Sequence, residues 1–346
     1  MAIALRHADL EGDRELLLDT LSRYLTPHAN GARFDWLYRN NPHGQAKAWI
    51  AIDQDKGDVV GMASAFPRRV YVDAHEALSW VLGDFCVHDR YRSLGPALQL
   101  QRACLAGVDS GTVAFCYDFP STTMLAIYRR LRLDISAHML RLAKPLRVDR
   151  KIAALVRSPM LALGLSATGN LVLALYDWRC RGGTTVTISP HEKPCGVEFS
   201  QLAQQLRDRY GVCVQRSAEY LNWRYFANPL RHYEMLTARS NDVLVAYAIF
   251  GRDHSDAILV DLFGVDDSMV IRSLVNTMLT LLREGGIITV SVPILESHPW
   301  VGPLQRLGFS ARETSPVVIY APHPLPSSCG AFGGTEWFLM YGDRDS

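Results

Sequence analysis

Apolar positions in the first 145 residues switch between helical and strand-like spacing. Leu17, Leu21 and Tyr24 fall on one side of a helix that we expect to begin near Asp9. Short apolar runs separated by polar turn residues then predict strands. A strand meander that enters a βαβα unit is typical of an α+β layered domain. The predicted order after an opening strand and this helix is strands 47–53, 58–72 and 77–87, helix 95–108, strand 112–117, helix 121–131 and strand 135–142.

The second half of the chain repeats an aromatic motif of the first. Residues 36–42 and 223–229 share the pattern W-x-Y-x-x-N-P at an offset of 187 residues. Four matched positions alone can arise by chance, but a hairpin pattern follows each copy and favours two related domains. A helix at 267–283 and a strand at 287–292 continue the second copy. We expect two α+β domains, 1–145 (the first repeat) and 195–346 (the second repeat), each a mixed central sheet flanked by helices, and a partly helical connector at 146–194.

The connector contains 19 consecutive residues without a formal charge, 158–176. That length is close to what a membrane-spanning helix needs. Pro159, Gly164, Ser166 and Asn170 leave it only moderately apolar. We therefore expect a helix packed between the domains, or one in contact with a membrane surface, rather than a spanning helix.

Composition narrows the class of protein. The 346 residues carry a formal net charge of +1, so we expect no nucleic-acid partner. Seven cysteines occur without a CxxC pair, which is typical of reduced thiols in a cytoplasmic protein. The first residues lack the pattern of a signal peptide. No HExxH or comparable spacing of histidines predicts a metal site, and no G-x-S-x-G predicts a serine nucleophile.

Residues 86–97 carry the most informative chemistry. An apolar strand is followed by a basic segment with Arg90 and Arg92, and a helix begins near Gly95. Pro96 suits the first turn of a helix, where its missing N–H costs no hydrogen bond. Free amides and the positive dipole end of such a helix bind phosphate oxygens, and the arginines add charge. The segment therefore predicts a site for a small ligand that carries phosphate.

This segment resembles the pyrophosphate loop of the GNAT N-acetyltransferase superfamily. Residues 92–97, R-S-L-G-P-A, match the family pattern R/Q-x-x-G-x-G/A. Residues 121–133 look like its later N-x6-Y-x-K-x-G-F segment, and 5–9 resemble its first strand and turn, so the resemblance spans most of 1–143. It implies acetyl-CoA (coenzyme A) as the cofactor. The implied cofactor-binding residues are Phe85, Cys86, Val87, Arg90, Arg92, Ser93, Leu94, Gly95, Pro96, Ala97 and Ser121.

The sequence departs from the family pattern at several positions. Ser121 stands where Asn is common, Asp89 where Pro is usual, and Arg132-Leu133 where Gly-Phe is usual. In the second repeat, residues 305–309 match the late segment, but residues 263–268 contain two acids and no basic loop. We expect the second repeat to bind cofactor poorly or not at all, and to serve in substrate shaping or packing.

The resemblance implies transfer of an acetyl group from acetyl-CoA to an amine. The amine must be neutral to attack the thioester, so a base or an ordered water must take its proton. Asp84, on the strand that enters the loop, is the candidate base; a structural aspartate is the alternative interpretation, and His88 is a weaker candidate. Tyr128 matches the family tyrosine that protonates the departing thiolate. The alternative interpretation is that Tyr128 is an aromatic residue that only packs in the core.

The repeated aromatic motif is the candidate acceptor site. Trp36, Tyr38 and Asn41 are the candidate substrate-binding residues, with the 223–229 copy as a second possibility. A structural corner is the alternative, because aromatic rings bury area and Asn-Pro stops a helix. We expect a small-molecule amine acceptor and a monomer or homodimer. Analogy alone with bacterial tandem proteins of this kind suggests an amino sugar or another cell-surface polysaccharide precursor as the acceptor.

Two other functions stay open. One is an acyltransferase that uses a longer acyl chain or, like Fem-type enzymes, aminoacyl-tRNA, although the net charge of +1 argues against a tRNA partner. The other is a non-catalytic CoA-binding scaffold. Acceptor pockets are built by variable loops, and no motif here identifies the acceptor.

Overall fold

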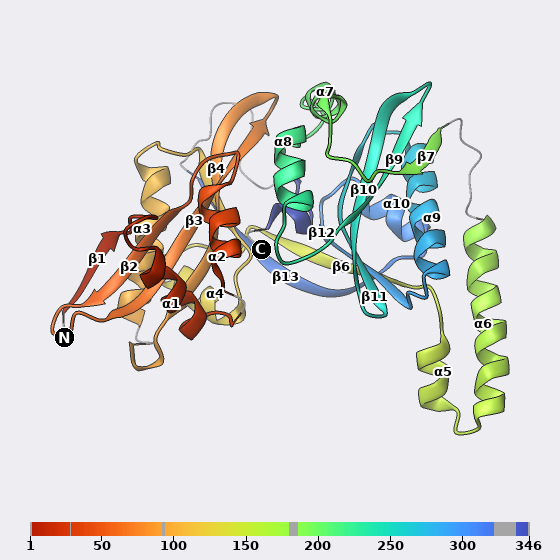
Figure 1. The fold of residues 1–346 in the computed structure, drawn as a ribbon, viewed down its shortest axis with the longest axis horizontal. Coiled ribbons are helices and arrows are strands. Elements are labelled where there is room, and N and C mark those ends of the chain that lie inside the picture. Colours follow the sequence, from red (N-terminus) through yellow and green to blue (C-terminus); the bar gives the residue numbers. More distant parts are fainter. Residues whose placement is uncertain (1, 28, 92–93, 180–185, 322–336, 345–346) are drawn as a thin grey trace.

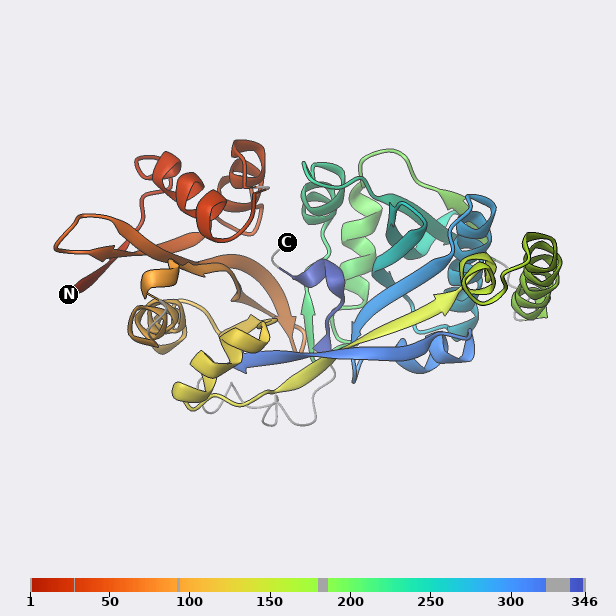
Figure 2. The ribbon, with the colours of Figure 1, turned by 90° about the horizontal axis from the view of Figure 1, so that it is seen from below.

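The computed structural model describes residues 2–27, 29–91, 94–179, 186–321 and 337–344. Two α/β halves lie side by side, and helices cover both faces of their strands (Figures 1 and 2). The predicted class, a mixed central sheet flanked by helices, is confirmed.

The first half and the connector comprise β1 (Ile3–His7), α1 (Arg14–Tyr24), α2 (Gly31–Phe34), the π-helical turn η1 (Asp35–Arg39), β2 (Lys47–Asp53), β3 (Val59–Val72), β4 (His75–Val87), the 3₁₀ turn η2 (Asp89–Tyr91), α3 (Leu94–Asp109), β5 (Phe115–Asp118), α4 (Thr122–Arg130), β6 (Ala137–Pro145), α5 (Asp149–Leu155) and α6 (Pro159–Arg179).

The second half has the same meander followed by alternating helices and strands. Its antiparallel strands β9, β10 and β11 correspond to β2, β3 and β4 of the first half. It comprises β7 (Thr187–Pro190), α7 (Val197–Gln205), β8 (Val212–Val214), α8 (Ala218–Leu221), the π-helical turn η3 (Asn222–Phe226), β9 (Glu234–Ser240), β10 (Val243–Asp253), β11 (Asp256–Gly264), α9 (Ser268–Glu284), β12 (Thr289–Leu295), α10 (Val301–Arg306), β13 (Ser310–Tyr320), β14 (Trp337–Phe338) and the 3₁₀ turn η4 (Tyr341–Asp343).

One continuous sheet joins the two halves. Its strand order is β1-β2-β3-β4-β5-β13-β6-β12-β11-β10-β9-β7. We expected the strand at 135–142 to complete the first repeat, and this expectation is wrong. β6 pairs instead with β12 and β13 of the second half, and the far end of β13 pairs with β5 of the first half. β13 is long enough to contact both neighbours, so each half depends on a strand from the other. The domain boundaries themselves remain a prediction.

The connector does not lie between the halves. Helices α5 and α6 form a hairpin that projects from the second half (Figures 1 and 2). α6 packs along α5, where a Cβ on Gly169 would lie 2.6 Å from Val148 Cγ2. The expectation of a connector packed between the domains is therefore wrong. Within the described part of the chain, no helix combines the length and apolar character that crossing a bilayer requires.

The repeat seen in the sequence holds in three dimensions. α2 and α8, and η1 and η3, begin and end at the same offset of 187 residues. Asn30 and Ser217 cap the two helices with their side chains. Each π-helical turn closes with an i to i+5 hydrogen bond of 2.8 Å, from Asn40 N to Asp35 O and from Ala227 N to Asn222 O.

The late segments of the two repeats also match. After α4, Arg132 adopts a left-handed φ of +60°, and after α10, Gly308 adopts a φ of +88°. Glycine is the residue that this position favours. Arg132 therefore takes the backbone conformation of the glycine that the family pattern has there.

The two aromatic motifs meet at the junction of the halves. The indole rings of Trp36 and Trp223 stack with centroids 5.0 Å apart and planes 22° apart. Trp36 Nε1 donates to Trp223 O, and Trp223 Nε1 donates to Trp36 O, both at 2.8 Å. Arg68 lies over the ring of Trp223 and Arg224 over that of Trp36, at 5.5 and 5.6 Å. The motif therefore forms a reciprocal joint between the halves.

This joint predicts strong coupling between the two tryptophans. Trp36→Phe removes one indole donor and leaves a buried carbonyl without its partner, so it should lower the free energy of unfolding by about 1–3 kcal/mol. Trp223→Phe should do the same, and the double variant should lose less than the sum of the two because they share one stack. Urea unfolding of the four proteins measures this coupling. The control is Trp49→Phe in β2, whose loss of unfolding free energy should add to that of Trp36→Phe. If the losses of Trp36→Phe and Trp223→Phe also add, the result would contradict the joint.

Candidate active site

The candidate site lies where two parallel strands of the first half separate. β4 pairs with β5 only over Ser79–Val81 and Phe115–Tyr117, and β4 then continues to Val87. A cavity of about 230 Å³ lies beyond the paired residues. It is lined by Ala63, Ser64, Leu82, Gly83, Phe85, Gln101, Cys104, Asp118, Phe119, Pro120, Ser121, Met124 and Arg344.

A β-bulge at Asp84 shapes one wall of this cavity. Met62 pairs with Cys86 and Ser64 with Gly83, so the register shifts across the bulge. Asp84 itself has a φ of +47°, a left-handed conformation that Asp and Asn accept more readily than most residues. The bulge turns the strand where the cavity begins.

A buried ion pair fixes the bulge. Arg33 Nη2 and Nη1 donate to the two carboxylate oxygens of Asp84 at 2.7 and 2.8 Å, and the Tyr38 hydroxyl donates to Asp84 Oδ2 at 2.7 Å. The side chains of Arg33 and Asp84 are only 5% and 3% exposed. Both oxygens of the candidate base are thus engaged by partners from α2 and η1.

Tyr128, the candidate proton donor, lies on α4 behind the cavity wall. Its hydroxyl donates to Asp118 Oδ2 at 2.5 Å and accepts from Gln101 Nε2 at 2.9 Å. Both partners line the cavity. Burial, and then the charge of Asp118, raise the pKa of Tyr128 well above its usual value, so the phenol keeps its proton at neutral pH.

The thiols near the cavity are protonated. Burial, followed by the charge of Asp84, raises the pKa of Cys86 to about 12, and Cys86 lies in the core rather than on the cavity wall. Burial likewise raises the pKa of Cys104, which does line the cavity. Only a thiolate is a strong nucleophile, so these cysteines are placed to pack rather than to react.

The predicted phosphate-binding segment lies at the start of α3. Arg90 is exposed in η2, and its backbone N–H donates to His88 Nδ1 at 3.0 Å. Gly95 is exposed in the first turn of α3, whereas Pro96 and Ala97 are buried. Arg92 and Ser93 lie outside the described residues, as does the side chain of Leu94. Of the other predicted cofactor residues, Phe85 and Ser121 line the cavity, Ser121 caps α4, and Val87 packs half-buried between α3 and α4.

The corresponding cleft of the second half is closed by the chain itself. β11 and β12 pair over Asp256–Ile258 and Thr289–Ser291 and then separate. Met340 bridges Ile294 in this gap, and its sulfur accepts from Leu262 N at 3.2 Å. Met340 and η4 thus fill the position that the cavity has in the first half.

Buried charges hold this closing segment in place. Arg216 donates to Asp261 on β11 at 3.1 Å and to Asp343 on η4 at 2.9 Å. The Tyr225 hydroxyl donates to Asp261 at 3.2 Å, as Tyr38 does to Asp84. Burial raises the pKa of Asp261 to about 6, although the charge of Arg216 opposes the shift.

The helix start of the second half is also closed to an anion. The Asp267 carboxylate accepts from Met269 N at 2.8 Å and from Val270 N at 3.4 Å. It therefore occupies the amides that would otherwise face a phosphate and brings a negative charge to them. Asp266 pairs with Arg209. This arrangement agrees with the expectation of poor cofactor binding by the second repeat, which remains a prediction.

The candidate acceptor residues of the first repeat do not line the cavity, although the Tyr38 hydroxyl lies 3.0 Å from Oγ of Ser64, which does. Trp36 belongs to the joint, Tyr38 contacts Asp84, and Asn41 Nδ2 donates to Pro67 O at 3.0 Å. All three are buried, and none lines the cavity. Their role in binding an acceptor remains a prediction.

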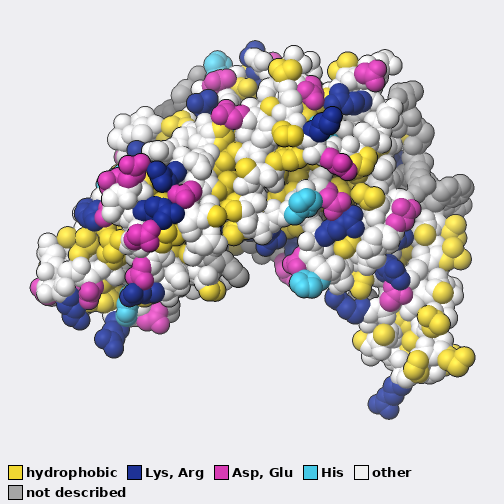
Figure 3. Space-filling model, in the orientation of Figure 1, with side chains coloured by type: hydrophobic (Ala, Val, Ile, Leu, Met, Phe, Trp, Pro, Cys, Tyr) yellow, Lys and Arg dark blue, Asp and Glu magenta, His cyan; other side chains and the backbone are white. Residues whose placement is uncertain are grey.

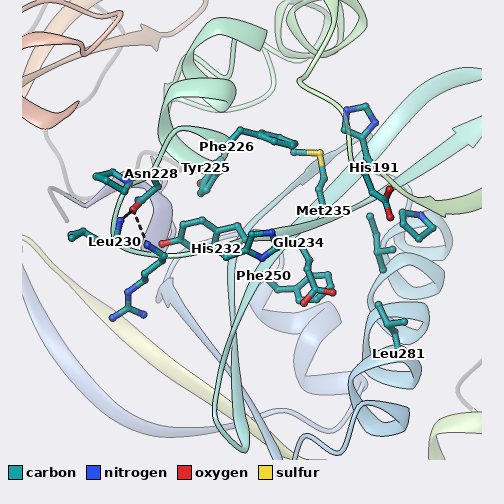
Figure 4. Close-up of a pocket in the computed structure, with 16 residues that line it drawn as sticks. His191, Tyr225, Phe226, Asn228, Leu230, His232, Glu234, Met235, Phe250 and Leu281 are labelled. Carbon is teal, nitrogen blue, oxygen red and sulfur yellow. Dashed lines mark hydrogen bonds between the residues drawn. The ribbon is translucent and has the colours of Figure 1, made fainter. Parts of the chain in front are cut away.

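Part of the second motif lines a larger cavity of about 780 Å³ (Figure 4). Tyr225, Asn228 and Pro229 are on its wall. Asn228 Oδ1 accepts from Leu230 N and Arg231 N, at 2.9 and 3.1 Å, and so shapes the loop at its edge. Burial lowers the pKa of His191, which lies on the opposite side in Figure 4, so this ring is neutral at pH 7.

Asp118, Gln101 and Arg344 also line the cavity but were not among the residues predicted from the sequence. Asp118 follows the buried strand predicted at 112–117. Because ligands commonly lie beyond the carboxyl ends of parallel strands, its position at such an end could have indicated a site residue. Gln101 and Arg344 gave no such indication, because they reach the cavity only through tertiary packing. Among the described residues, no group of three or more His, Cys, Asp or Glu side chains is arranged to hold a metal ion.

Comparison with solved structures shows that the chain has the fold of the GCN5-related N-acetyltransferases. A probable N-acyltransferase of Enterococcus faecalis is similar with a TM-score of 0.68 and 12% identity, over 93% of this chain and 73% of that one. A GCN5-related N-acetyltransferase of Anabaena variabilis has a TM-score of 0.64 and 12% identity, over 92% and 72%. Saccharomyces cerevisiae N-myristoyltransferase with bound myristoyl-CoA has a TM-score of 0.56 and 10% identity, over 92% and 79%. No family model and no curated protein matches the sequence. The GNAT resemblance of the sequence is thus confirmed at the level of the fold.

The ion pair beneath the bulge generates a stability prediction. Asp84→Asn suits the left-handed backbone but leaves the buried Arg33 without its counter-charge, so it should lower the free energy of unfolding by about 3–5 kcal/mol. Adding Arg33→Met should recover much of that loss. The matched control is Glu313→Gln in the exposed Arg141–Glu313 pair, which should cost about 1 kcal/mol or less. Urea unfolding compares them, and equal losses at the two sites would refute a structural role for Asp84.

Proposed function

We propose that this chain is an acyltransferase whose first half binds a coenzyme A thioester, and that it transfers an acetyl group to the amine of a small acceptor. One observation carries the proposal. In the first half, two parallel strands separate around a cavity with Asp118 at its wall and the neutral Tyr128 hydrogen-bonded to it from behind, beside a helix that begins after a turn containing Arg90. In the second half, the same places are filled by protein.

The start of α3 suits the pyrophosphate of the cofactor. Gly95 exposes the backbone of the first turn, and Arg90 adds a positive charge before it. A helix start of this kind binds phosphate oxygens through its free amides. The pantetheine arm would then enter between β4 and β5, past Phe85 and Ser121. When bound, the cofactor supplies an activated acyl group as a thioester.

The size of the cavity favours a short acyl group. The cavity offers about 230 Å³ and opens to solvent. An acetyl thioester and the end of a pantetheine arm fit this space. A fourteen-carbon chain, as in the myristoyl-CoA of the yeast neighbour, would have to extend beyond this cavity.

Tyr128 and Asp118 are arranged to move the protons of the reaction. The amine nitrogen forms a bond to the thioester carbon as the carbon–sulfur bond breaks. The amine proton goes to Asp118, directly or through water, and Tyr128 gives its proton to the departing thiolate. Asp118 then returns a proton to Tyr128 across their 2.5 Å hydrogen bond, so the products are an amide and a free thiol. Asp84 acts in this proposal as a positioning residue that holds the bulge.

The cofactor site is tested by adding a negative charge at the start of α3. Gly95→Glu places a carboxylate where the pyrophosphate would bind, so it should weaken acetyl-CoA binding at least tenfold. The matched control is Ser268→Glu, which makes the same change in charge at the start of α9 in the second half, and it should leave binding unchanged. Calorimetric titration measures both. Absence of acetyl-CoA binding to the wild-type protein, or equal loss in the two variants, would overturn the assignment.

The proton donor is tested with Tyr128→Phe. Turnover with acetyl-CoA and a panel of amines should fall about 100-fold or more, while acetyl-CoA affinity changes little. Because the pKa of Tyr128 lies well above 10, the wild-type rate should not decline between pH 8 and 10 through ionisation of this group. Tyr320→Phe removes another tyrosine–aspartate hydrogen bond of 2.5 Å, to Asp109, and serves as the control with unchanged turnover. Cofactor binding without turnover by the wild-type protein would favour the scaffold alternative.

A further inference from the structure

The connector hairpin has a closed inner seam. Gly169 of α6 lies against Val148, which precedes α5. Asn170 Oδ1 accepts from Val148 N at 2.8 Å, and Asn170 Nδ2 donates to Asp149 Oδ1 at 3.0 Å. Ser166, on the same side of α6, is buried. These contacts fix which face of α6 meets its neighbour and which face points away.

The opposite face of α6 is an unpartnered apolar stripe. At 100° per residue its members fall within an arc of about 140°, and they extend over about 22 Å along the helix. They are between 52% and 87% exposed, and Figure 3 shows apolar side chains gathered over the projecting hairpin. The outer stripe consists of Met160, Leu161, Leu165, Leu171, Val172 and Leu175, and Leu163, which is also exposed, lies beside it outside the arc. A contiguous patch of this kind is typical of a surface that binds something.

Charges around the stripe are predominantly positive. Between residues 147 and 179 the sequence has five basic residues and two acids, Asp149 and Asp177. A cavity of about 320 Å³ at the base of the hairpin is lined by four arginines, Arg141, Arg147, Arg150 and Arg312, and by Asp256. Arg141 pairs with Glu313 and Arg147 with Asp149. Arg150 and Arg312 have no acidic partner among the residues that the structure describes.

We propose that the hairpin docks on the surface of a membrane that contains anionic phospholipids. The outer stripe enters the boundary between head groups and acyl chains, and Arg150, Arg157 and Arg312 lie at the level of the phosphates. Apolar side chains that enter the acyl boundary, with basic side chains of neighbouring elements near the phosphates, favour binding to anionic lipid. The projection of the hairpin lets it reach a bilayer without burying the sheet or the candidate active site (Figures 1 and 2).

Charge favours lipid over a second copy of the chain. Two stripes in contact would bring two sets of arginines together, whereas an anionic bilayer supplies the opposite charge. Protein interfaces also form about one hydrogen bond per 100–200 Å². The side chains of the outer stripe are all aliphatic or thioether and offer no such partners, which acyl chains do not need.

The experiment is co-sedimentation of the full chain with vesicles. Wild-type protein should bind vesicles of phosphatidylcholine with phosphatidylserine, and bind more weakly to phosphatidylcholine alone. The stripe variant Met160→Gln/Leu161→Gln/Leu165→Gln should lose at least about tenfold in affinity, and Arg150→Gln/Arg157→Gln about fivefold per arginine. The control Val197→Gln/Val243→Gln/Met269→Gln changes three exposed apolar residues elsewhere and should bind like wild type.

A second measurement needs no variant. Hydrogen exchange of the wild-type amides in α6 should slow when anionic vesicles are added, whereas exchange in α7 should not change. Failure of the wild-type protein to bind anionic vesicles would overturn the proposal, as would equal binding by the stripe variant. A dimer seen by light scattering that the stripe variant dissociates, without any binding to vesicles, would assign the stripe to a second copy and also overturn it.

Discussion

The stacked pair of Trp36 and Trp223 is the constraint on which the arrangement of the halves depends. Each indole N–H satisfies a backbone carbonyl of the other π-helical turn, so neither turn is complete alone. Because the two contacts are equivalent, they relate the halves by an approximate two-fold axis. That axis brings the free end of β5 to β13 and the free edge of β12 to β6. Exchange of these strands then makes one sheet from two repeats and couples their stability.

The same local architecture has two outcomes in this chain. In each half a tyrosine of the π-helical turn contacts an aspartate on the third strand of the meander, as in Tyr38–Asp84 and Tyr225–Asp261. The first half completes its aspartate with Arg33 from its own α2 and leaves the cleft open. The second half uses Arg216 to tie Asp261 to the closing segment near the end of the chain. Closure is tight, because a Cβ on Gly342 would collide with the hydroxyl of Tyr225. The buried aspartate Asp84 thus supports an open cavity in the first half, whereas Asp261 holds the segment that fills the corresponding cleft of the second half.

The sequence predicted what depends on local pattern. The repeat, most strand and helix positions, the helix start at Gly95 and the acids at 266–267 all follow from spacing of apolar, capping and charged residues. It did not predict the exchange of β6 and β13, because pairing between distant strands leaves no mark on local periodicity. Asp84 was predicted as a base because its buried partner, Arg33, lies 51 residues earlier in the chain, and local patterns do not reveal contacts between distant residues. Asp118 was overlooked although it follows a predicted strand, since a single acid at a strand end is a common pattern.

The open cleft and the connector hairpin lie in different parts of the molecule. The open cleft belongs to the first half, whereas the apolar hairpin leaves the second half at the far end of the molecule (Figure 1). A surface that binds lipid at the hairpin therefore does not cover the cleft, and the rigid joint of the two tryptophans fixes the orientation of one relative to the other. Under the two proposals made above, the protein would meet a bilayer in one orientation with the proposed cofactor site still facing water.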